Sequence, residues 1–207
     1  MKSDLYEANL RRLLEPRSIA VVGASERAGS FGDRMTTEVL RSPSSPQVHL
    51  VHPKYTQVHG LPCAPTLMDL DGPVDLVMLG VPDATLTDQL AQARQRGDGA
   101  GIVFGTAHGI GPELAAIAKD AGLALCGGGS MGYLNLTRGV RAIGYVERFP
   151  LEPGPIALVT HSGSVFSALL RTHRQLDFAL AVSSGQELVT TTADYLAYAL
   201  ELEETRV

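Results

Sequence analysis

Hydrophobic and polar positions along this chain are grouped in blocks that predict strands alternating with helices. Continuous apolar runs, with the composition of buried parallel strands, lie at 18–23, 48–51, 74–81, 101–104 and 123–126. Segments with apolar residues at helical spacing lie at 32–41, 86–96 and 112–121. Strands that alternate with such helices indicate βαβ units. We therefore expect an α/β fold in which a parallel sheet carries helices on both faces.

The pattern breaks after residue 137. Residues 138–153 are rich in charge and proline, and we expect an extended connector there. A second α/β unit is predicted for 154–207, with strands at 156–160 and 178–182 and helices at 165–174 and 192–202. Two strands with two helices seldom fold alone. We therefore predict a first domain at 1–137, a connector at 138–153, and a second domain at 154–207 that is cut short.

Composition excludes several classes of function. The 207 residues include 17 Lys and Arg against 22 Asp and Glu, with no basic run, which argues against a nucleic-acid partner. No apolar run reaches the ~18 residues of a membrane span, and the charged start is unlike a signal peptide. The two cysteines form neither a zinc pattern nor a disulfide framework, so we expect a cytoplasmic location. The histidines lack metal-ligand spacing, and we assign no metal site.

The loop after the first predicted strand is the first candidate for chemistry, because ligands of open parallel sheets bind at the carboxyl ends of strands. It runs from Gly23 to Gly32 and leads into a helix, whose free N–H groups can bind a phosphate. Ser25 stands where the dinucleotide fingerprint G-x-G-x-x-G has its second glycine, which disfavours NAD. A glycine-rich structural turn is the alternative.

Two further loops have residues suited to anions. Lys54 follows the second strand, where an NAD enzyme has an acidic ribose ligand, so it either binds an anion or is a solvated surface lysine. The turn Thr160–Ser164 combines hydroxyls with a helix N-terminus and serves either as an anion site or as a plain N-cap. A catalytic pair of His161 and Ser162 is disfavoured, because no third member and no G-x-S-x-G motif are apparent.

Several segments together resemble the NDP-forming acyl-CoA synthetases, a family that includes the α subunit of succinyl-CoA synthetase. LEPRSIAVVGAS at 14–25, HPKY at 52–55 and VP at 81–82 resemble the family's Rossmann-like CoA-binding domain. PGPIALVTHSGS at 153–164, SGQE at 184–187 and DYL at 194–196 resemble the start of its flavodoxin-like domain. The resemblance spans nearly the whole chain in the family's order.

The resemblance implies the formation of acyl-CoA from an acid, CoA and a nucleoside triphosphate, through a phosphohistidine that lies beyond this chain. It implies CoA as the ligand of this part, and ATP or another nucleoside triphosphate with Mg²⁺ on an ATP-grasp domain or subunit. We also expect an oligomer. The residues that it assigns to CoA are Gly23, Ala24, Ser25, Arg27, Gly29, Pro53, Lys54, Val81 and Pro82. It assigns the phosphate to Ser162, Gly163 and Ser164, and no catalytic residue to this chain.

The chain departs from the family at three places. Gly127–Ser130 replaces a Gly-Pro-Asn-Cys motif, residues 105–109 lack the usual glutamate, and His161 stands where Gln or Arg is common. Two functions therefore stay open. The chain is either the CoA-binding part of an acid–thiol ligase or a non-catalytic CoA- or acyl-CoA-sensing module of a larger regulatory protein, as in fusions to protein acetyltransferases. A plain NAD-binding domain is the third alternative.

Overall fold

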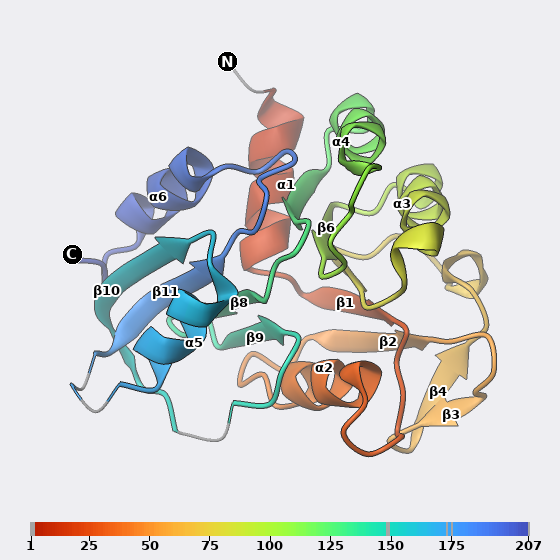
Figure 1. Cartoon of the computed structure of the whole chain (residues 1–207), viewed down its shortest axis with the longest axis horizontal. Coiled ribbons are helices and arrows are strands. Elements are labelled where there is room, and N and C mark those ends of the chain that lie inside the picture. The colour runs from red at the N-terminus through yellow and green to blue at the C-terminus, as the bar shows by residue number, and fades with distance from the viewer. Residues whose placement is uncertain (1–2, 148–149, 173, 175, 207) are drawn as a thin grey trace.

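The computed structural model describes residues 3–147, 150–172, 174 and 176–206, and these residues form two β-sheets with flanking helices (Figure 1). The helices are α1 (Asp4–Leu14), α2 (Phe31–Leu40), α3 (Asp83–Arg96), α4 (Gly111–Asp120), α5 (Gly163–Leu170) and α6 (Thr192–Glu201), with a 3₁₀ turn at Leu67–Asp69. The strands of the first sheet are β1 (Ser18–Val22), β2 (Gln47–Val51), β3 (Gln57–Val58), β4 (Leu61–Ala64), β5 (Leu76–Leu79), β6 (Ala100–Val103) and β7 (Ala124–Gly127). Those of the second are β8 (Gly132–Asn135), β9 (Val140–Ile143), β10 (Pro153–Thr160) and β11 (Phe178–Ser183).

The first sheet has the strand order β3-β4-β2-β1-β5-β6-β7 and is parallel except for the β3–β4 hairpin. The chain moves outward in one direction through β2 and in the other through β5, β6 and β7. Because βαβ crossovers are right-handed, this reversal places the connecting helices on opposite faces. Figure 1 shows α2 on one face and α1, α3 and α4 on the other. The predicted α/β fold is confirmed.

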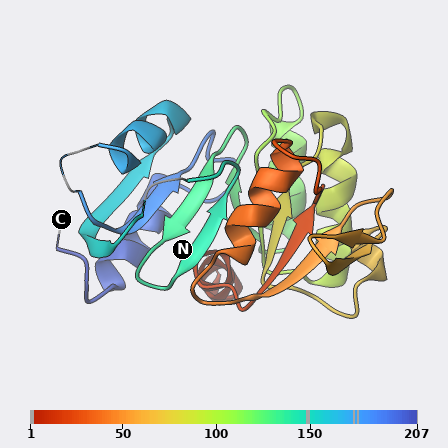
Figure 2. The same cartoon turned by 90° about the horizontal axis from the view of Figure 1, so that it is seen from below.

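The second sheet has the order β10-β11-β8-β9, with a parallel β10–β11 pair and antiparallel β8 and β9 (Figure 2). The segment 138–153, expected to be an extended connector, contains β9, whose residues are all buried. The charged residue of β9, Arg141, is buried, because it pairs with the buried Glu38 of α2. The predicted domain boundary after residue 137 falls inside the β8–β9 hairpin. As a division into folding units it stays a prediction.

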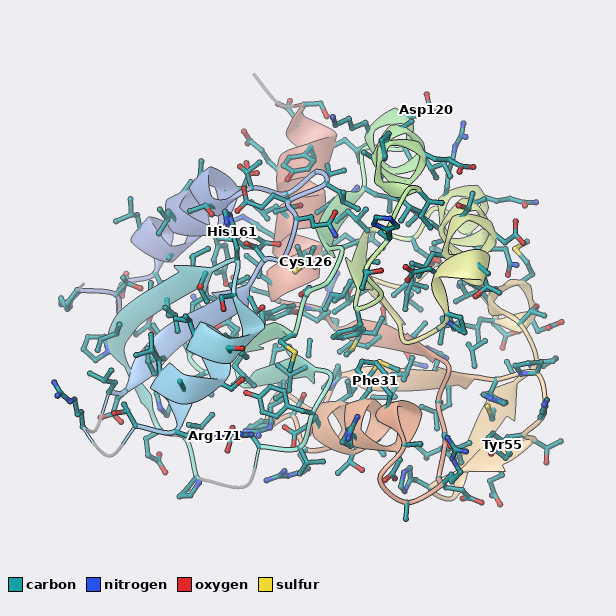
Figure 3. The ribbon with its side chains drawn as sticks, in the orientation of Figure 1. Phe31, Tyr55, Asp120, Cys126, His161 and Arg171 are labelled. Atoms are coloured by element: carbon teal, nitrogen blue, oxygen red, sulfur yellow. The ribbon has the colours of Figure 1, made fainter. Side chains whose placement is uncertain are left out.

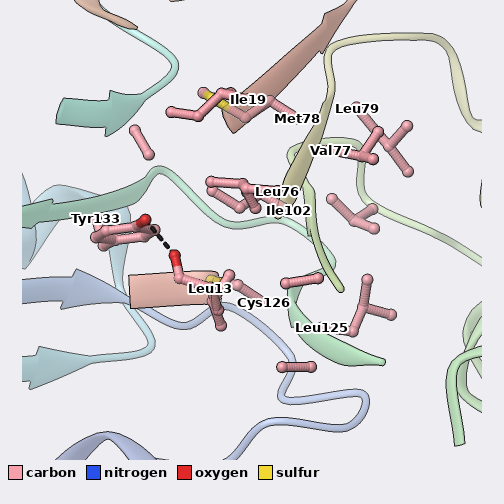
Figure 4. Close-up of a cluster of buried hydrophobic side chains, with 14 of the residues drawn as sticks. Leu13, Ile19, Leu76, Val77, Met78, Leu79, Ile102, Leu125, Cys126 and Tyr133 are labelled. Atoms are coloured by element: carbon pink, nitrogen blue, oxygen red, sulfur yellow. Dashed lines mark hydrogen bonds between the residues drawn. The ribbon is translucent and has the colours of Figure 1, made fainter. Parts of the chain in front are cut away.

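Helix α1 joins the two sheets and was not predicted as an element. Ser3 caps its N-terminus by accepting the N–H of Tyr6 at 3.3 Å, and acidic and basic residues occupy its first and last turns, respectively, as the helix dipole favours. Its C-terminal carbonyls receive side-chain hydrogen bonds from β8. Tyr133 donates to the carbonyl of Leu13 (Figure 4), and Asn135 donates to that of Leu14 at 3.0 Å. No helix in the described part of the chain is long and apolar enough to cross a membrane.

Candidate functional site

A cavity of about 380 Å³ lies at the C-terminal ends of β1, β2 and β5. Its volume is within the range of small-molecule sites, and the point where strand order reverses is where open α/β sheets bind ligands. The residues that line it end or follow these three strands, follow β4 or lie on α3: Val22, Gly23, Val51, His52, Pro53, Pro65, Thr66, Gly80, Val81, Pro82, Thr85 and Gln89. Four of the predicted CoA residues are thus brought together here: Gly23, Pro53, Val81 and Pro82.

Glycines allow the end of β1, the end of β5 and the start of α2 to lie close together beside this cavity. Gly23 has φ +89°, and a Cβ there would lie 2.4 Å from the carbonyl oxygen of Gly80. A Cβ on Gly32, in the first turn of α2, would lie 2.1 Å from the oxygen of Gly23. In the sequence, Gly32 was identified only as the end of the loop, and Gly80 was not singled out. Their spacing gave no signal, because they meet only once β5 and α2 are packed on β1.

The other predicted residues of the first loop lie outside the cavity wall. Ala24 is fully buried, and the N–H groups of Gly23 and Ala24 both donate to the carbonyl of Val51, at 2.9 and 3.3 Å. Ser25 is nearly buried and accepts the N–H of Arg27 at 3.1 Å. Arg27 itself is exposed on the loop.

The loop ends in a capped helix. Ser30 accepts the N–H of Asp33 at 3.2 Å, and the Asp33 carboxylate accepts the N–H of the exposed Gly29 at 2.9 Å. The same carboxylate lies 3.2 Å from Nε2 of His59 at the tip of the β3–β4 hairpin. One backbone donor of the predicted phosphate loop is therefore engaged by the protein's own carboxylate.

The segment after β2 presents a histidine to the cavity and a lysine to solvent. His52 lines the cavity, stacks on Tyr55 with ring centroids 4.4 Å apart, and accepts the N–H of Lys54 on Nδ1 at 3.1 Å. Burial lowers the pKa of His52, and the charge of Lys54 lowers it further. The Lys54 side chain is exposed and does not line the cavity.

The turn between β10 and α5 is a capped helix N-terminus. Ser162 accepts the N–H of Val165 at 3.3 Å, so it is the N-cap of α5. A Cβ on Gly163 would lie 2.5 Å from Cγ of Met131, which explains the absence of a side chain at this position. Ser164 is exposed in the first turn. Capping is thus present at the turn, and the phosphate role of Ser162, Gly163 and Ser164 stays a prediction.

His161 has a partner that the sequence analysis missed. Its Nε2 lies 2.9 Å from Oε1 of Glu187, a residue 26 positions later in the chain. The same oxygen accepts the Ser184 hydroxyl at 3.2 Å and both the N–H, at 2.8 Å, and the hydroxyl of Thr192. Burial would raise the pKa of Glu187, but these hydrogen bonds outweigh it and lower the pKa. Glu187 also has φ +54°, uncommon for a residue other than glycine. No local motif joins the two residues, so only the fold reveals the pair.

Hydrogen bonds fasten the loop of Glu187 to the first sheet. The neighbouring Gln186 donates its N–H to the carbonyl of Gly128 at 2.9 Å and its side-chain amide to the carbonyl of Thr106 at 2.6 Å. The Thr106 hydroxyl in turn donates to Asp83 at 2.6 Å, directly after Pro82 of the cavity wall. The C-terminal ends of strands from both sheets therefore meet at one edge of the molecule.

The atypical Gly127–Ser130 segment is built into this junction. Ser130 is buried, donates its hydroxyl to the carbonyl of Ser183 at 2.6 Å, and accepts the N–H of Gly132 at 2.7 Å. Burial raises the pKa of the Cys126 thiol nearby, so the thiol is favoured over the reactive thiolate. Across the described residues, no group of three or more His, Cys, Asp or Glu side chains could hold a metal ion.

Comparison with known families decides the assignment of the first sheet. A family model described as a CoA binding domain matches residues 17–135, more than half of the chain. The chain belongs to the CoA binding domain family. A second model, described as a succinyl-CoA ligase like flavodoxin domain, matches residues 153–207. The CoA binding domain therefore contains β1 to β8, and the second match contains β10 and β11.

The relatives are acyl-CoA ligases. The chain is 29% identical to trans-feruloyl-CoA synthase FCS1 from an unknown prokaryotic organism, over 95% of this chain and 30% of the relative. It is also 29% identical to ADP-forming acetate–CoA ligase I from Archaeoglobus fulgidus, over 96% of this chain and 30% of the relative. The chain spans about 30% of the length of these relatives. The predicted resemblance to NDP-forming acyl-CoA synthetases is confirmed.

Solved structures support the fold. The dinucleotide-forming acetyl-coenzyme A synthetase 1 of Ca. Korarchaeum cryptofilum, in its apo form, matches with a TM-score of 0.88 and 24% identity. The match covers 95% of this chain and 44% of the synthetase chain, so it includes both sheets.

Proposed function

We propose that this chain binds coenzyme A as the CoA-binding part of an NDP-forming acyl-CoA synthetase. The observation that carries the proposal is the cavity at the ends of β1, β2 and β5, which lies inside the matched CoA binding domain. It gathers Gly23, Pro53, Val81 and Pro82 from three separate loops.

The chemistry of the cavity suits the nucleotide part of CoA. Its wall combines apolar surface from Val22, Val51 and Val81 with an imidazole, His52, whose pKa is lowered. A neutral aromatic ring can stack on an adenine base. In the proposal, Lys54 beside the cavity and Arg27 on the first loop approach the phosphates with positive charge, while Ala24, Ser25 and Gly29 complete the loop. Among the described residues, no acidic side chain lines the wall to bind ribose hydroxyls as in NAD enzymes.

The second part of the proposal concerns phosphate. The N–H groups at the start of α5, with the Ser162 and Ser164 hydroxyls, would receive the phosphate that is exchanged during the reaction. Gly163→Val should abolish binding of inorganic phosphate at this turn while CoA binding stays within twofold. Loss of CoA affinity in a folded Gly163→Val protein would contradict the division into two sites.

The complete reaction requires parts that these 207 residues do not include. An acid, CoA and a nucleoside triphosphate would give acyl-CoA, nucleoside diphosphate and phosphate through a phosphohistidine outside this chain. ATP or another nucleoside triphosphate, with Mg²⁺, would bind an ATP-grasp domain or subunit. An oligomeric state, a cytoplasmic location and a domain division near residue 137 are further expectations of this proposal.

Calorimetric titration with CoA and with NAD tests the proposal. The chain should bind CoA and give no saturable heat with NAD at the same concentrations. Tight binding of NAD without a CoA signal would refute it and favour the NAD-binding alternative.

A CoA-sensing module of a larger regulatory protein is the second candidate. The specific observation in its favour is Ser130, which stands where the resemblance places the cysteine of Gly-Pro-Asn-Cys and whose buried hydroxyl is engaged by two backbone hydrogen bonds. Reading the native gene beyond codon 207 separates the two. An ATP-grasp segment with a later histidine motif supports the ligase, and an acetyltransferase-like domain supports the sensor.

A further inference from the structure

We propose that His161 is an acid–base residue for acyl transfer between an acyl phosphate and the thiol of CoA, with Glu187 as its positioning residue. This inference rests on the proposed binding of CoA. It adds a catalytic group to a chain for which the family resemblance implies none.

The hydrogen bonds around Glu187 determine how His161 is oriented. An ionised carboxylate can only accept, and the lowered pKa of Glu187 keeps it ionised near neutral pH. Nε2 of His161 therefore carries a hydrogen and donates it to Oε1 at 2.9 Å. No described residue forms a hydrogen bond with Nδ1, and 67% of the His161 side chain is exposed. An imidazole held by a carboxylate on one nitrogen and open on the other is the arrangement of a general base.

The carboxylate itself is rigidly placed. The Glu187 carboxylate accepts hydrogen bonds from the Ser184 hydroxyl and from both the N–H and the hydroxyl of Thr192, at the start of α6. The backbone of Glu187 has φ +54°. Uncommon backbone conformations of this kind concentrate at functional sites. Among the described side chains, His161 in contrast forms a hydrogen bond with Glu187 alone and depends on it for its orientation.

The pair lies beside the predicted phosphate turn and is connected to the cavity proposed for CoA. His161 directly precedes Ser162, the N-cap of α5 and the predicted phosphate position. The loop of Glu187 is fastened through Gln186 and Thr106 to Asp83, next to Pro82 of the cavity wall. His161, labelled in Figure 3, follows β10, whose Thr160 carbonyl accepts the N–H of Ser184 at 2.9 Å. The Ser184 carbonyl in turn accepts the N–H of Gly127, at the end of β7, at 3.1 Å. The pair of His161 and Glu187 is therefore adjacent to the predicted phosphate turn and linked by hydrogen bonds to the wall of the cavity.

The step balances without further reagents. Nδ1 of His161 takes the proton of the CoA thiol as sulfur forms a bond to the carbonyl carbon of the acyl phosphate. The bond between that carbon and the bridging oxygen then breaks, and the oxygen keeps the electron pair. The departing phosphate takes the proton from the imidazolium, which restores neutral His161. The products are an acyl thioester and hydrogen phosphate, and the reverse direction uses the imidazolium to protonate the leaving thiolate.

Other groups at this edge are less suited to the role. The Cys126 thiol is fully buried, with a raised pKa, and Ser130 already donates its hydroxyl to a backbone carbonyl. Asp83 is engaged by Thr106, and hydrogen bonding from that hydroxyl lowers the pKa of Asp83, which makes it a weak base.

The test uses the full 207-residue chain with acetyl phosphate and CoA, and follows thioester formation against a protein-free control. The wild-type chain should form acetyl-CoA faster than the control. His161→Ala should form acetyl-CoA at least about 100-fold more slowly than wild type, because general acid–base catalysis contributes at least this much. Added imidazole should restore part of the lost rate. Glu187→Gln should lower kcat while KM for CoA stays within twofold. His49→Gln, in the middle of β2 and outside the cavity wall, is the matched control and should leave the rate unchanged.

Two results would overturn the inference: no thioester above the protein-free rate, or a folded His161→Ala chain as fast as wild type. Failure of imidazole to restore any rate in that variant would also count against an acid–base role. Calorimetric titration of the same preparations with CoA separates this from the proposed function. A chain that binds CoA but fails the transfer test refutes only the role of His161, whereas absence of CoA binding refutes the proposed function itself.

Discussion

Replacement of Glu38 should lower the free energy of unfolding, because Glu38 links α2, which packs on the first sheet, to β9 of the second sheet. Glu38 lies on α2 and is fully buried. Its Oε2 accepts the Nε–H of Arg141, on β9, at 2.8 Å. Its Oε1 accepts the backbone N–H of Glu147 at 3.2 Å and lies 2.5 Å from Nη1 of Arg41. Glu38→Ala removes this acceptor and leaves the Arg141 guanidinium buried without its carboxylate.

The expected loss of stability follows from that uncompensated charge. Arg141 is only 9% exposed, so water cannot replace the carboxylate without opening the contact between α2 and β9. Breaking a buried ion pair by removing one partner costs about 3–5 kcal/mol. By contrast, the exposed pair of Arg94 and Asp120, with side chains 51% and 61% exposed, should contribute at most about 1 kcal/mol. Asp120→Ala is therefore the matched control.

Urea denaturation followed by circular dichroism and tyrosine fluorescence measures both variants. Glu38→Ala should lower the free energy of unfolding by about 3–5 kcal/mol, and Asp120→Ala by about 1 kcal/mol or less. A double variant, Glu38→Leu with Arg141→Leu, should recover part of the loss, because hydrophobic replacement of a buried pair is often neutral, while the N–H of Glu147 still loses its acceptor. A Glu38→Ala protein within about 1 kcal/mol of wild type would refute the assignment of this ion pair as a buried link between the sheets.

Three further outcomes are expected. Lys54→Glu should weaken CoA binding by about 1–2 kcal/mol in calorimetry, as for loss of a charge-assisted contact, and an unchanged affinity would make Lys54 a solvated surface lysine. Burial would raise the pKa of Asp75, but hydrogen bonds from Arg12 and from the N–H groups of Arg17 and Ser18 outweigh it and lower the pKa. Asp75 therefore stabilises the fold above about pH 4 and loses this contribution as pH falls through its folded pKa. In urea denaturation, the free energy of unfolding of Asp75→Asn should fall less steeply than that of wild type as the pH is lowered below about 4. An unchanged pH dependence would contradict this. With labelled ATP, Mg²⁺, an acid and CoA, the chain alone should form neither a phosphohistidine nor acyl-CoA, and an acid-labile phosphate on His161 would contradict this.

The sequence predicted those elements whose signal is local. The five apolar runs of the first sheet became β1, β2, β5, β6 and β7, because strands buried on both faces are continuously hydrophobic. Gly23 was identified from its place between strand and helix, and the structure explains it by the close approach of the Gly80 carbonyl.

The missed elements depend on contacts between distant parts of the chain. β9 was taken for connector because Arg141 indicated solvent, whereas its partner Glu38 lies 103 residues earlier. The β3–β4 hairpin is too short for a periodic signal. The segment of helix α1 was noted only for its charge, and its contact with the second sheet depends on Tyr133 and Asn135 of β8. Glu187 could not be linked to His161 by spacing, because a turn, α5 and β11 separate them.

A crystal structure of this chain with CoA would show whether the cavity is the CoA site. Electron density for the nucleotide part of CoA is expected in the cavity among Gly23, Pro53 and Pro82, with the thiol directed toward His161 and Glu187. Density for CoA in another place, such as the groove between α1 and α6 lined by Tyr6 and Tyr198, would contradict the assignment of the site.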